Sequence, residues 1–148
     1  MTRIAVAVLG TPYRGDDAVG PLVGERLRAA GVDVLDCGDE PTRLIDPFAD
    51  VHLAVLVDVV RSGAAPGTVH RVEAHGGALP RELGLASTHA VGVGDALALA
   101  HALGRGPRQV VLIGIEGRAF GMGEPLTPEV ERAIGTATSA VLGILAAN

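Results

Sequence analysis

The sequence predicts an α/β fold: a three-layer α/β/α sandwich whose mostly parallel sheet has about five strands, one of them an antiparallel edge strand. Apolar, β-branched runs typical of buried parallel strands alternate along the chain with stretches of helical periodicity. One connection between strands is too short for a parallel crossover. The 148 residues, 48% hydrophobic and 20% charged, suit one globular domain, which we expect to span residues 1–148.

The first elements are a strand, a loop and a helix. RIAVAVLG, residues 3–10, predicts a buried strand, and apolar residues at helical spacing over 19–30 predict the first helix. The loop between them holds two adjacent acids, Asp16 and Asp17. A second strand is predicted over 32–37, after a glycine that suits a helix C-cap.

The middle of the chain contains the strand that decides direction. Thr42 is the expected N-cap of a short helix over 43–48, and HLAVLVDVV at 52–60 predicts a buried strand that carries Asp58 near its end. The connection from there to TVHRV at 68–72 is too short for a crossover helix. Together with the charged, alternating pattern of residues 68–72, this short connection predicts an antiparallel edge strand.

The last third supplies two helices and one strand. After the return segment 73–88, a helix is predicted to open at His89, with Ser87 and Thr88 as capping residues, and to end at Gly104. QVVLIGI at 109–115 predicts the final strand, which stops at Glu116. A glycine-rich loop and then a helix follow, the helix having Thr127 as N-cap and Pro128 at its first position.

Composition excludes several classes of function. A net charge of −5 and very few aromatic residues argue against nucleic-acid binding. No apolar run approaches the roughly 18 residues of a membrane span, and no signal peptide is visible, so we expect a cytoplasmic protein without membrane contact. Cys37, the only cysteine, excludes an intrachain disulfide and a multi-thiolate metal site, and we interpret it as a small buried residue.

Motifs for common cofactors and nucleophiles are missing. The first loop, LGTPYRGDDAVG, lacks the glycine spacing of a dinucleotide site and has acids where a pyrophosphate would lie. The sequence has neither a phosphate-binding Gly-Lys-Ser/Thr motif nor the GxSxG elbow of serine hydrolases.

Acidic residues gather instead at the predicted carboxyl edge of the sheet, where open α/β sheets bind ligands. Asp16 is interpreted first as an N-cap of the first helix, while Asp17 either favours the helix dipole or points into this edge. Asp58 either anchors a loop or needs a cation, because a carboxylate at the end of LAVLV is costly to bury. With His89 these acids form an N/O set suited to nickel or zinc. The remaining histidines, which we interpret as structural, are His52, His70, His75 and His101.

Four stretches in order resemble the hydrogenase maturation endopeptidases: GDDAVG, VLVDVVRSGAAPGTVH, STHAVGVGDALALA and GIEGRAFGMGEPLTPEV. The resemblance implies a peptidase that removes a short C-terminal extension from the precursor of a nickel–iron hydrogenase large subunit after nickel insertion. It implies that Asp17, Asp58 and His89 are both the metal-recognising and the catalytic residues, with Asp16 as the alternative to Asp17. The nickel would belong to the substrate, no tightly bound cofactor is expected in the free enzyme, and the enzyme would act as a monomer.

Three hypotheses follow for the chemistry. In the first, substrate-borne nickel fixes the scissile bond and one carboxylate activates water as a general base. In the second, the chain is a non-enzymatic α/β module that binds a metal or small ligand. In the third, Asp17 and Asp58 act as a metal-independent aspartic peptidase pair, which requires carboxylates close enough to share a proton.

Overall fold

Five strands form one sheet in the part of the chain that this computed structural model describes, residues 3–75 and 92–148. The strand order is β2-β1-β3-β5-β4. The strands are β1 Ile4–Val8, β2 Leu35–Asp36, β3 Leu53–Val60, β4 Val69–His75 and β5 Gln109–Glu116. The helices described are α1 Val19–Ala29, α2 Val93–Ala102, α3 Pro128–Ala146 and the short 3₁₀ helices η1 Gly15–Ala18 and η2 Pro41–Leu44.

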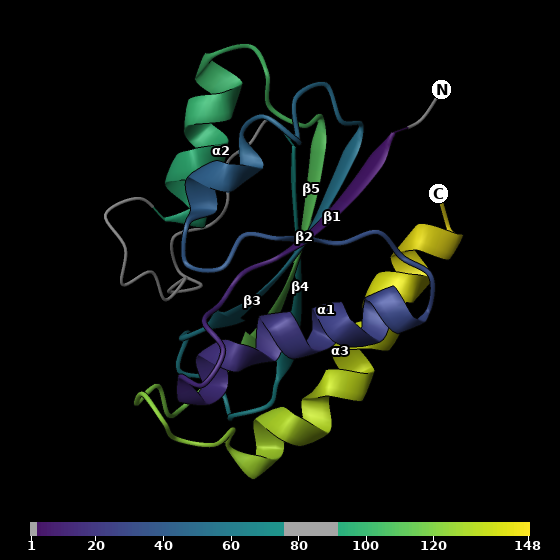
Figure 1. Cartoon of the computed structure of the whole chain (residues 1–148). Coiled ribbons are helices and arrows are strands. Elements are labelled where there is room, and N and C mark those ends of the chain that lie inside the picture. The colour runs from purple at the N-terminus through teal and green to yellow at the C-terminus, as the bar shows by residue number, and fades with distance from the viewer. Residues whose placement is uncertain (1–2, 76–91) are drawn as a thin grey trace.

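The sheet lies between two helical layers, as predicted. Helices α1 and α3 cover one face, and α2 with η2 covers the other (Figure 1). Side chains alternate along each buried strand, so Val6 and Val8 pack in the α1/α3 core while Ala7 and Leu9 pack under α2 and η2. All eight residues of β3 are buried, which explains why its sequence is apolar without alternation.

Strand directions confirm the argument from connection length. β1 pairs in parallel with β2 and β3, and β3 pairs in parallel with β5. β4 runs antiparallel to β5 at the edge, with Val69 opposite Ile115 and His75 opposite Gln109. Because the parallel strands point the same way, their carboxyl ends share one edge of the sheet.

Several predicted elements differ in extent; β4, for example, continues to His75, beyond the predicted strand at 68–72. β2 has only two residues, because the N–H of Val32 donates to the carbonyl of Leu27 and the guanidinium of Arg28 donates to the carbonyl of Val34. These bonds hold the segment on the end of α1 and away from β1. The expected cap Thr42 is wrong: it lies inside η2, which starts at Pro41 and has no side-chain cap. Proline suits that first position because its missing N–H would be unpaired there.

Helix α2 begins at Val93 in the described residues and ends before Gly104, whose φ of 70° confirms the predicted stop. The expected helix start at His89, with Ser87 and Thr88, lies outside the described residues. None of the helices in the described ranges is long and apolar enough to cross a membrane.

Candidate functional site

The loop after β1 brings Asp17 to the carboxyl edge beside Asp58. The N–H of Leu9 donates to the carbonyl of Val57 at 2.9 Å, so the end of β1 stays paired next to Asp58. The chain then turns sharply at Gly10, whose φ is 130° and where a Cβ would lie 2.0 Å from the carbonyl oxygen of Asp17. Only glycine allows this turn and this close return of the chain.

Hydrogen bonding orients the Asp17 side chain. The N–H of Thr11, one residue after the turn, donates to Asp17 Oδ2 at 2.9 Å. Asp17 is 9% exposed, so its carboxylate is largely shielded from bulk water. The sequence left open whether Asp17 favours the helix dipole or points into the sheet edge, and its side chain faces this loop at the sheet edge.

Asp58 is the residue with the most perturbed electrostatics at this edge. It is 8% exposed and accepts a hydrogen bond from the N–H of Val59 at 2.8 Å. Burial and the nearby charge of Asp17 raise the pKa of Asp58 to about 8, against the opposing effect of the Val59 hydrogen bond. A carboxyl poised near neutral pH beside a second carboxylate can act as a general base or bind a cation that relieves the repulsion.

The structure therefore describes two of the three predicted site residues. Asp17 and Asp58 lie together, whereas His89 is outside the described residues. Within residues 3–75 and 92–148, no group of three or more His, Cys, Asp or Glu side chains is arranged to hold a metal ion.

Asp16 does not cap the first helix. It lies inside η1 with no exposed surface, and its carboxylate accepts four hydrogen bonds from the loop before α3. Asp16 Oδ2 accepts from the N–H groups of Arg118 and Ala119 and from the hydroxyl of Thr127, and Oδ1 accepts from the Thr127 N–H. Burial works to raise the pKa of Asp16, but these bonds outweigh it and lower the pKa. Asp16 thus anchors the loop that follows β5.

Sequence reasoning missed a second buried carboxylate cluster. Glu116, 2% exposed at the end of β5, accepts hydrogen bonds from the N–H and hydroxyl of Ser62, and His70 Nε2 lies 3.1 Å from its Oε1. Burial works to raise the pKa of Glu116, and the bonds from Ser62, His70 and Gly63 lower it. We interpreted His70 as structural, and it is, but its partner could be found only from the register of β4 on β5.

Two side chains that could act as nucleophiles, Ser62 and Cys37, are not activated. The hydroxyl of Ser62 donates to the Glu116 carboxylate, and His70 faces both groups with the same nitrogen, Nε2, so the cluster lacks the serine–histidine–acid order of a triad. Cys37 is fully buried, as expected, and burial followed by the charge of Asp36 raises the pKa of its thiol to about 12. Carboxylate chemistry at Asp17 and Asp58 remains the strongest candidate.

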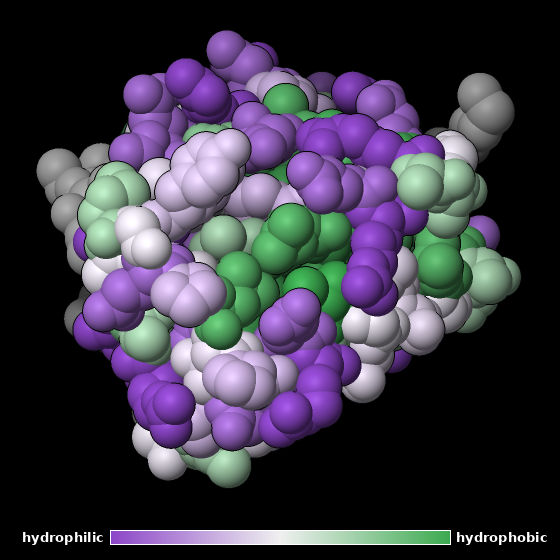
Figure 2. Space-filling view, turned by 60° about the horizontal axis from the view of Figure 1, so that its bottom comes forward, coloured by the Kyte–Doolittle hydropathy of each residue, from purple (hydrophilic) through white to green (hydrophobic). Residues whose placement is uncertain are grey.

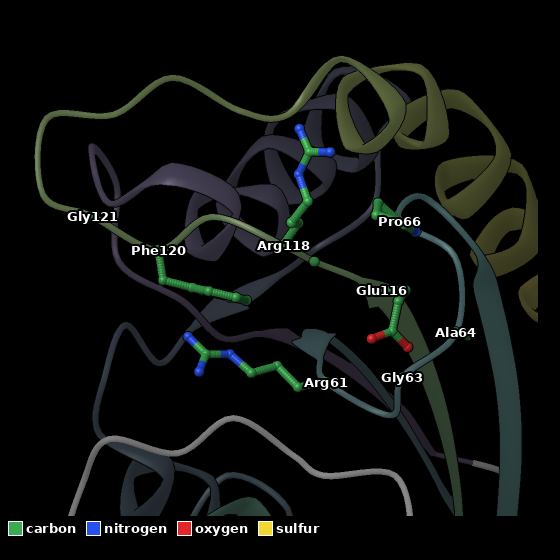
Figure 3. A pocket seen from close by; sticks show the side chains of 9 residues that line it. Arg61, Gly63, Ala64, Pro66, Glu116, Arg118, Phe120 and Gly121 are labelled. Carbon is green, nitrogen blue, oxygen red and sulfur yellow. The ribbon is translucent and has the colours of Figure 1, made fainter.

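A cavity of about 530 Å³ opens between the β3–β4 loop and the loop after β5 (Figure 3). Arg61, the first residue after β3, places its guanidinium 3.6 Å from the centroid of the Phe120 ring. Glu116 closes one wall of the cavity, its carboxylate turned toward the loop at Gly63.

Comparison with known proteins supports a peptidase assignment. A family model described as hydrogenase maturation protease matches residues 19–144. The hydrogenase expression/formation protein HupD of Thiocapsa roseopersicina is 32% identical over 152 residues, covering 97% of this chain and 68% of HupD. HoxM of Azotobacter vinelandii is 33% identical, covering 98% of this chain and 76% of HoxM.

Solved structures of hydrogenase maturation proteases are also similar to this chain. The hydrogenase maturating endopeptidase HybD from Escherichia coli superposes with a TM-score of 0.79 at 25% identity, over 97% of this chain and 92% of HybD. The [NiFe] hydrogenase maturation protease HycI from Thermococcus kodakarensis gives 0.75 at 28% identity, over 97% and 92%. The order of strands and helices, the acidic edge of the sheet and these matches lead to one conclusion: the chain belongs to the hydrogenase maturation protease family.

Proposed function

We propose that this protein is the endopeptidase that removes the C-terminal extension of a nickel–iron hydrogenase large-subunit precursor once nickel has been inserted. Asp17, Asp58 and His89 would coordinate the nickel carried by the precursor. The observation that carries the proposal is the Asp58–Asp17 pair, in which a buried carboxyl has its pKa raised to about 8 by burial and by its neighbour's charge. A divalent cation offered by the substrate would favour the ionised form of both groups.

The three residues would supply two kinds of metal ligand in this proposal. Asp58 and Asp17 supply oxygen ligands from the ends of β3 and η1, and His89 supplies nitrogen. Coordination would fix the scissile peptide at the sheet edge, and one carboxylate would take a proton from the attacking water. Because the metal arrives with the substrate, the free enzyme needs no cofactor of its own.

The surface offers features that suit a protein substrate. Tyr13 and Met122 are 82% and 73% exposed, and their loops are joined by a 2.7 Å hydrogen bond from the N–H of Gly123 to the carbonyl of Tyr13. In a view that brings the lower side of Figure 1 forward, Figure 2 shows an apolar area surrounded by polar side chains. Exposed apolar surface rimmed by polar residues is typical of protein–protein contact. We expect the enzyme to meet its precursor as a monomer in the cytoplasm.

A cleavage assay tests the proposal. Nickel-loaded and nickel-free forms of the large-subunit precursor from the same genome are incubated with wild type, Asp58→Asn and His89→Ala, with His101→Ala as the matched control on α2. We expect cleavage of the loaded precursor alone, loss in the two site variants and full activity in the control. Cleavage of both forms would discard nickel guidance, and cleavage of neither would favour a binding module.

The Asp17–Asp58 coupling also favours a second candidate, an aspartic peptidase in which the two carboxyls share a proton without metal. This mechanism makes cleavage indifferent to His89 and to nickel, and it requires one carboxyl protonated. Full activity of His89→Ala on a nickel-free precursor, falling as pH rises through about 8, would establish this second mechanism.

A further inference from the structure

Arg61 is a cation held in place beside the catalytic edge without a carboxylate partner in the described part of the chain. Its guanidinium packs on the ring of Phe120, 3.6 Å from the centroid, and makes no ion pair with any described acid. Glu116 lines the same cavity, but Ser62, His70 and Gly63 already engage its carboxylate. Among the described residues, no carboxylate therefore pairs with the Arg61 guanidinium at this cavity.

The fold provides this arrangement through Gly117. A Cβ at Gly117 would lie 2.8 Å from Phe120 Cζ and 2.6 Å from Val59 Cγ2, so only glycine leaves the ring room to lie against the end of β3. A guanidinium on a ring face keeps its N–H edge free, and that edge matches a carboxylate bidentately. The aromatic support reduces the side-chain freedom that binding would otherwise cost.

We propose that Arg61 is a specificity-determining residue, which binds an acidic side chain of the precursor within about three residues of the scissile bond. The inference rests on the proposed function. Arg61 follows Asp58 by three positions at the end of β3, and at about 3.3 Å per residue this separation corresponds to about three residues of extended peptide. A peptide fixed at Asp58 and Asp17 therefore reaches the Arg61 cavity with a nearby side chain.

The cavity and its charge define the occupant. Its volume of about 530 Å³ lies in the range of sites that enclose part of a ligand. Arginine and an aromatic ring together select a planar anion on a short stem, which in a peptide substrate is an aspartate or glutamate. Since the molecule carries a net charge of −5, the Arg61 cation beside two acids also favours one direction for such a peptide.

The test measures kcat and KM for cleavage of the loaded precursor by wild type, Arg61→Ala and Arg61→Glu. Arg108→Ala is the matched control, because this exposed arginine precedes β5, at the opposite end of that strand from the cavity, and does not line the cavity. Each Asp or Glu within three residues of the cleaved bond is also changed singly to Lys in the precursor. Thermal unfolding confirms that the variants are folded.

We expect Arg61→Ala to raise KM about tenfold or more with kcat nearly unchanged, as loss of one charge-assisted pair predicts. Arg61→Glu should raise KM further, and one Lys-substituted precursor should restore its cleavage. Equal KM for wild type and both Arg61 variants, an equal rise of KM in Arg108→Ala, or a precursor without any acid in that window would overturn the inference. Failure of wild type to cleave at all would instead overturn the proposed function.

Discussion

Replacing Asp58 by asparagine is expected to stabilise the fold at neutral and alkaline pH, although the proposed function predicts that it abolishes cleavage. The change is nearly isosteric, and the asparagine oxygen can still accept the hydrogen bond from the N–H of Val59. What disappears is a buried group that can ionise. A carboxyl whose pKa rises from 3.8 to about 8 on folding makes the ionised folded state less stable by on the order of 5 kcal/mol.

The sign follows from proton binding. Between pH 3.8 and about 8 the unfolded chain has released the Asp58 proton and the folded protein retains it, so wild-type stability falls as pH rises through this window. Asp58→Asn lacks that proton and loses this part of the slope. Its free energy of unfolding should therefore exceed the wild-type value increasingly from about pH 5 to about pH 8.

Urea unfolding followed by circular dichroism, repeated across that pH range, measures the difference from the transition midpoints. Other titrating groups are common to both proteins and cancel in the comparison. Asp33→Asn, at an exposed acid that makes no ion pair with a described residue, controls for loss of one negative charge. Parallel wild-type and Asp58→Asn curves would refute the assignment of a raised pKa to Asp58.

Three further substitutions test neighbouring parts of the site. Asp16→Asn should destabilise the fold by about 3 kcal/mol in urea unfolding, because an amide N–H₂ must face a buried donor. Since the pKa of Asp16 is lowered, this wild-type advantage should shrink as pH falls below 3.8. Asp17→Asn should lower the pKa of Asp58 in a carbon-13 carboxyl titration, because the charge that helps to raise it is gone; an unchanged pKa would separate the two residues. Glu116→Gln should lower the free energy of unfolding by about 2 kcal/mol, because the glutamine N–H₂ would face the N–H and hydroxyl donors of Ser62. Hydrogen exchange of the Ser62 amide should then become faster, and unchanged exchange would contradict the anchoring role.

The sheet could be predicted because its determinants are local. β3 and β5 are continuous apolar runs, and the short link from Asp58 to the run at 68–72 allows only an antiparallel return. The limits of β2 could not be predicted, since they depend on hydrogen bonds from Val32 and Arg28 that exist only once α1 is in place. Tertiary contacts decide the ends of short edge strands.

The site was predicted in part for the same reason. Asp58 lies near the end of the apolar run that forms β3, so its place at the carboxyl edge of the sheet follows from the topology. The Ser62–His70–Glu116 cluster joins residues from three segments, and its existence depends on which face of β4 turns inward. Arg61 carries no sequence signal of its own; the ring that supports it lies 59 positions away, on a loop whose course is fixed by Asp16.

Asp16 and Asp17 show most directly why a sequence motif alone is insufficient. The two acids are neighbours in GDDAVG, yet the structure gives them opposite tasks. They lie on a 3₁₀ helix with three residues per turn, so consecutive side chains point about 120° apart. One therefore enters the interior, where four donors stabilise its charge, and the other turns to the sheet edge, where it raises the pKa of Asp58. The stabilised carboxylate of Asp16 holds the loop that carries Phe120, while Asp17 and Asp58 form a pair of neighbouring acids at the sheet edge. The anchoring of this loop and the position of Asp17 thus depend on the same four-residue turn, and an insertion within it should disturb both at once.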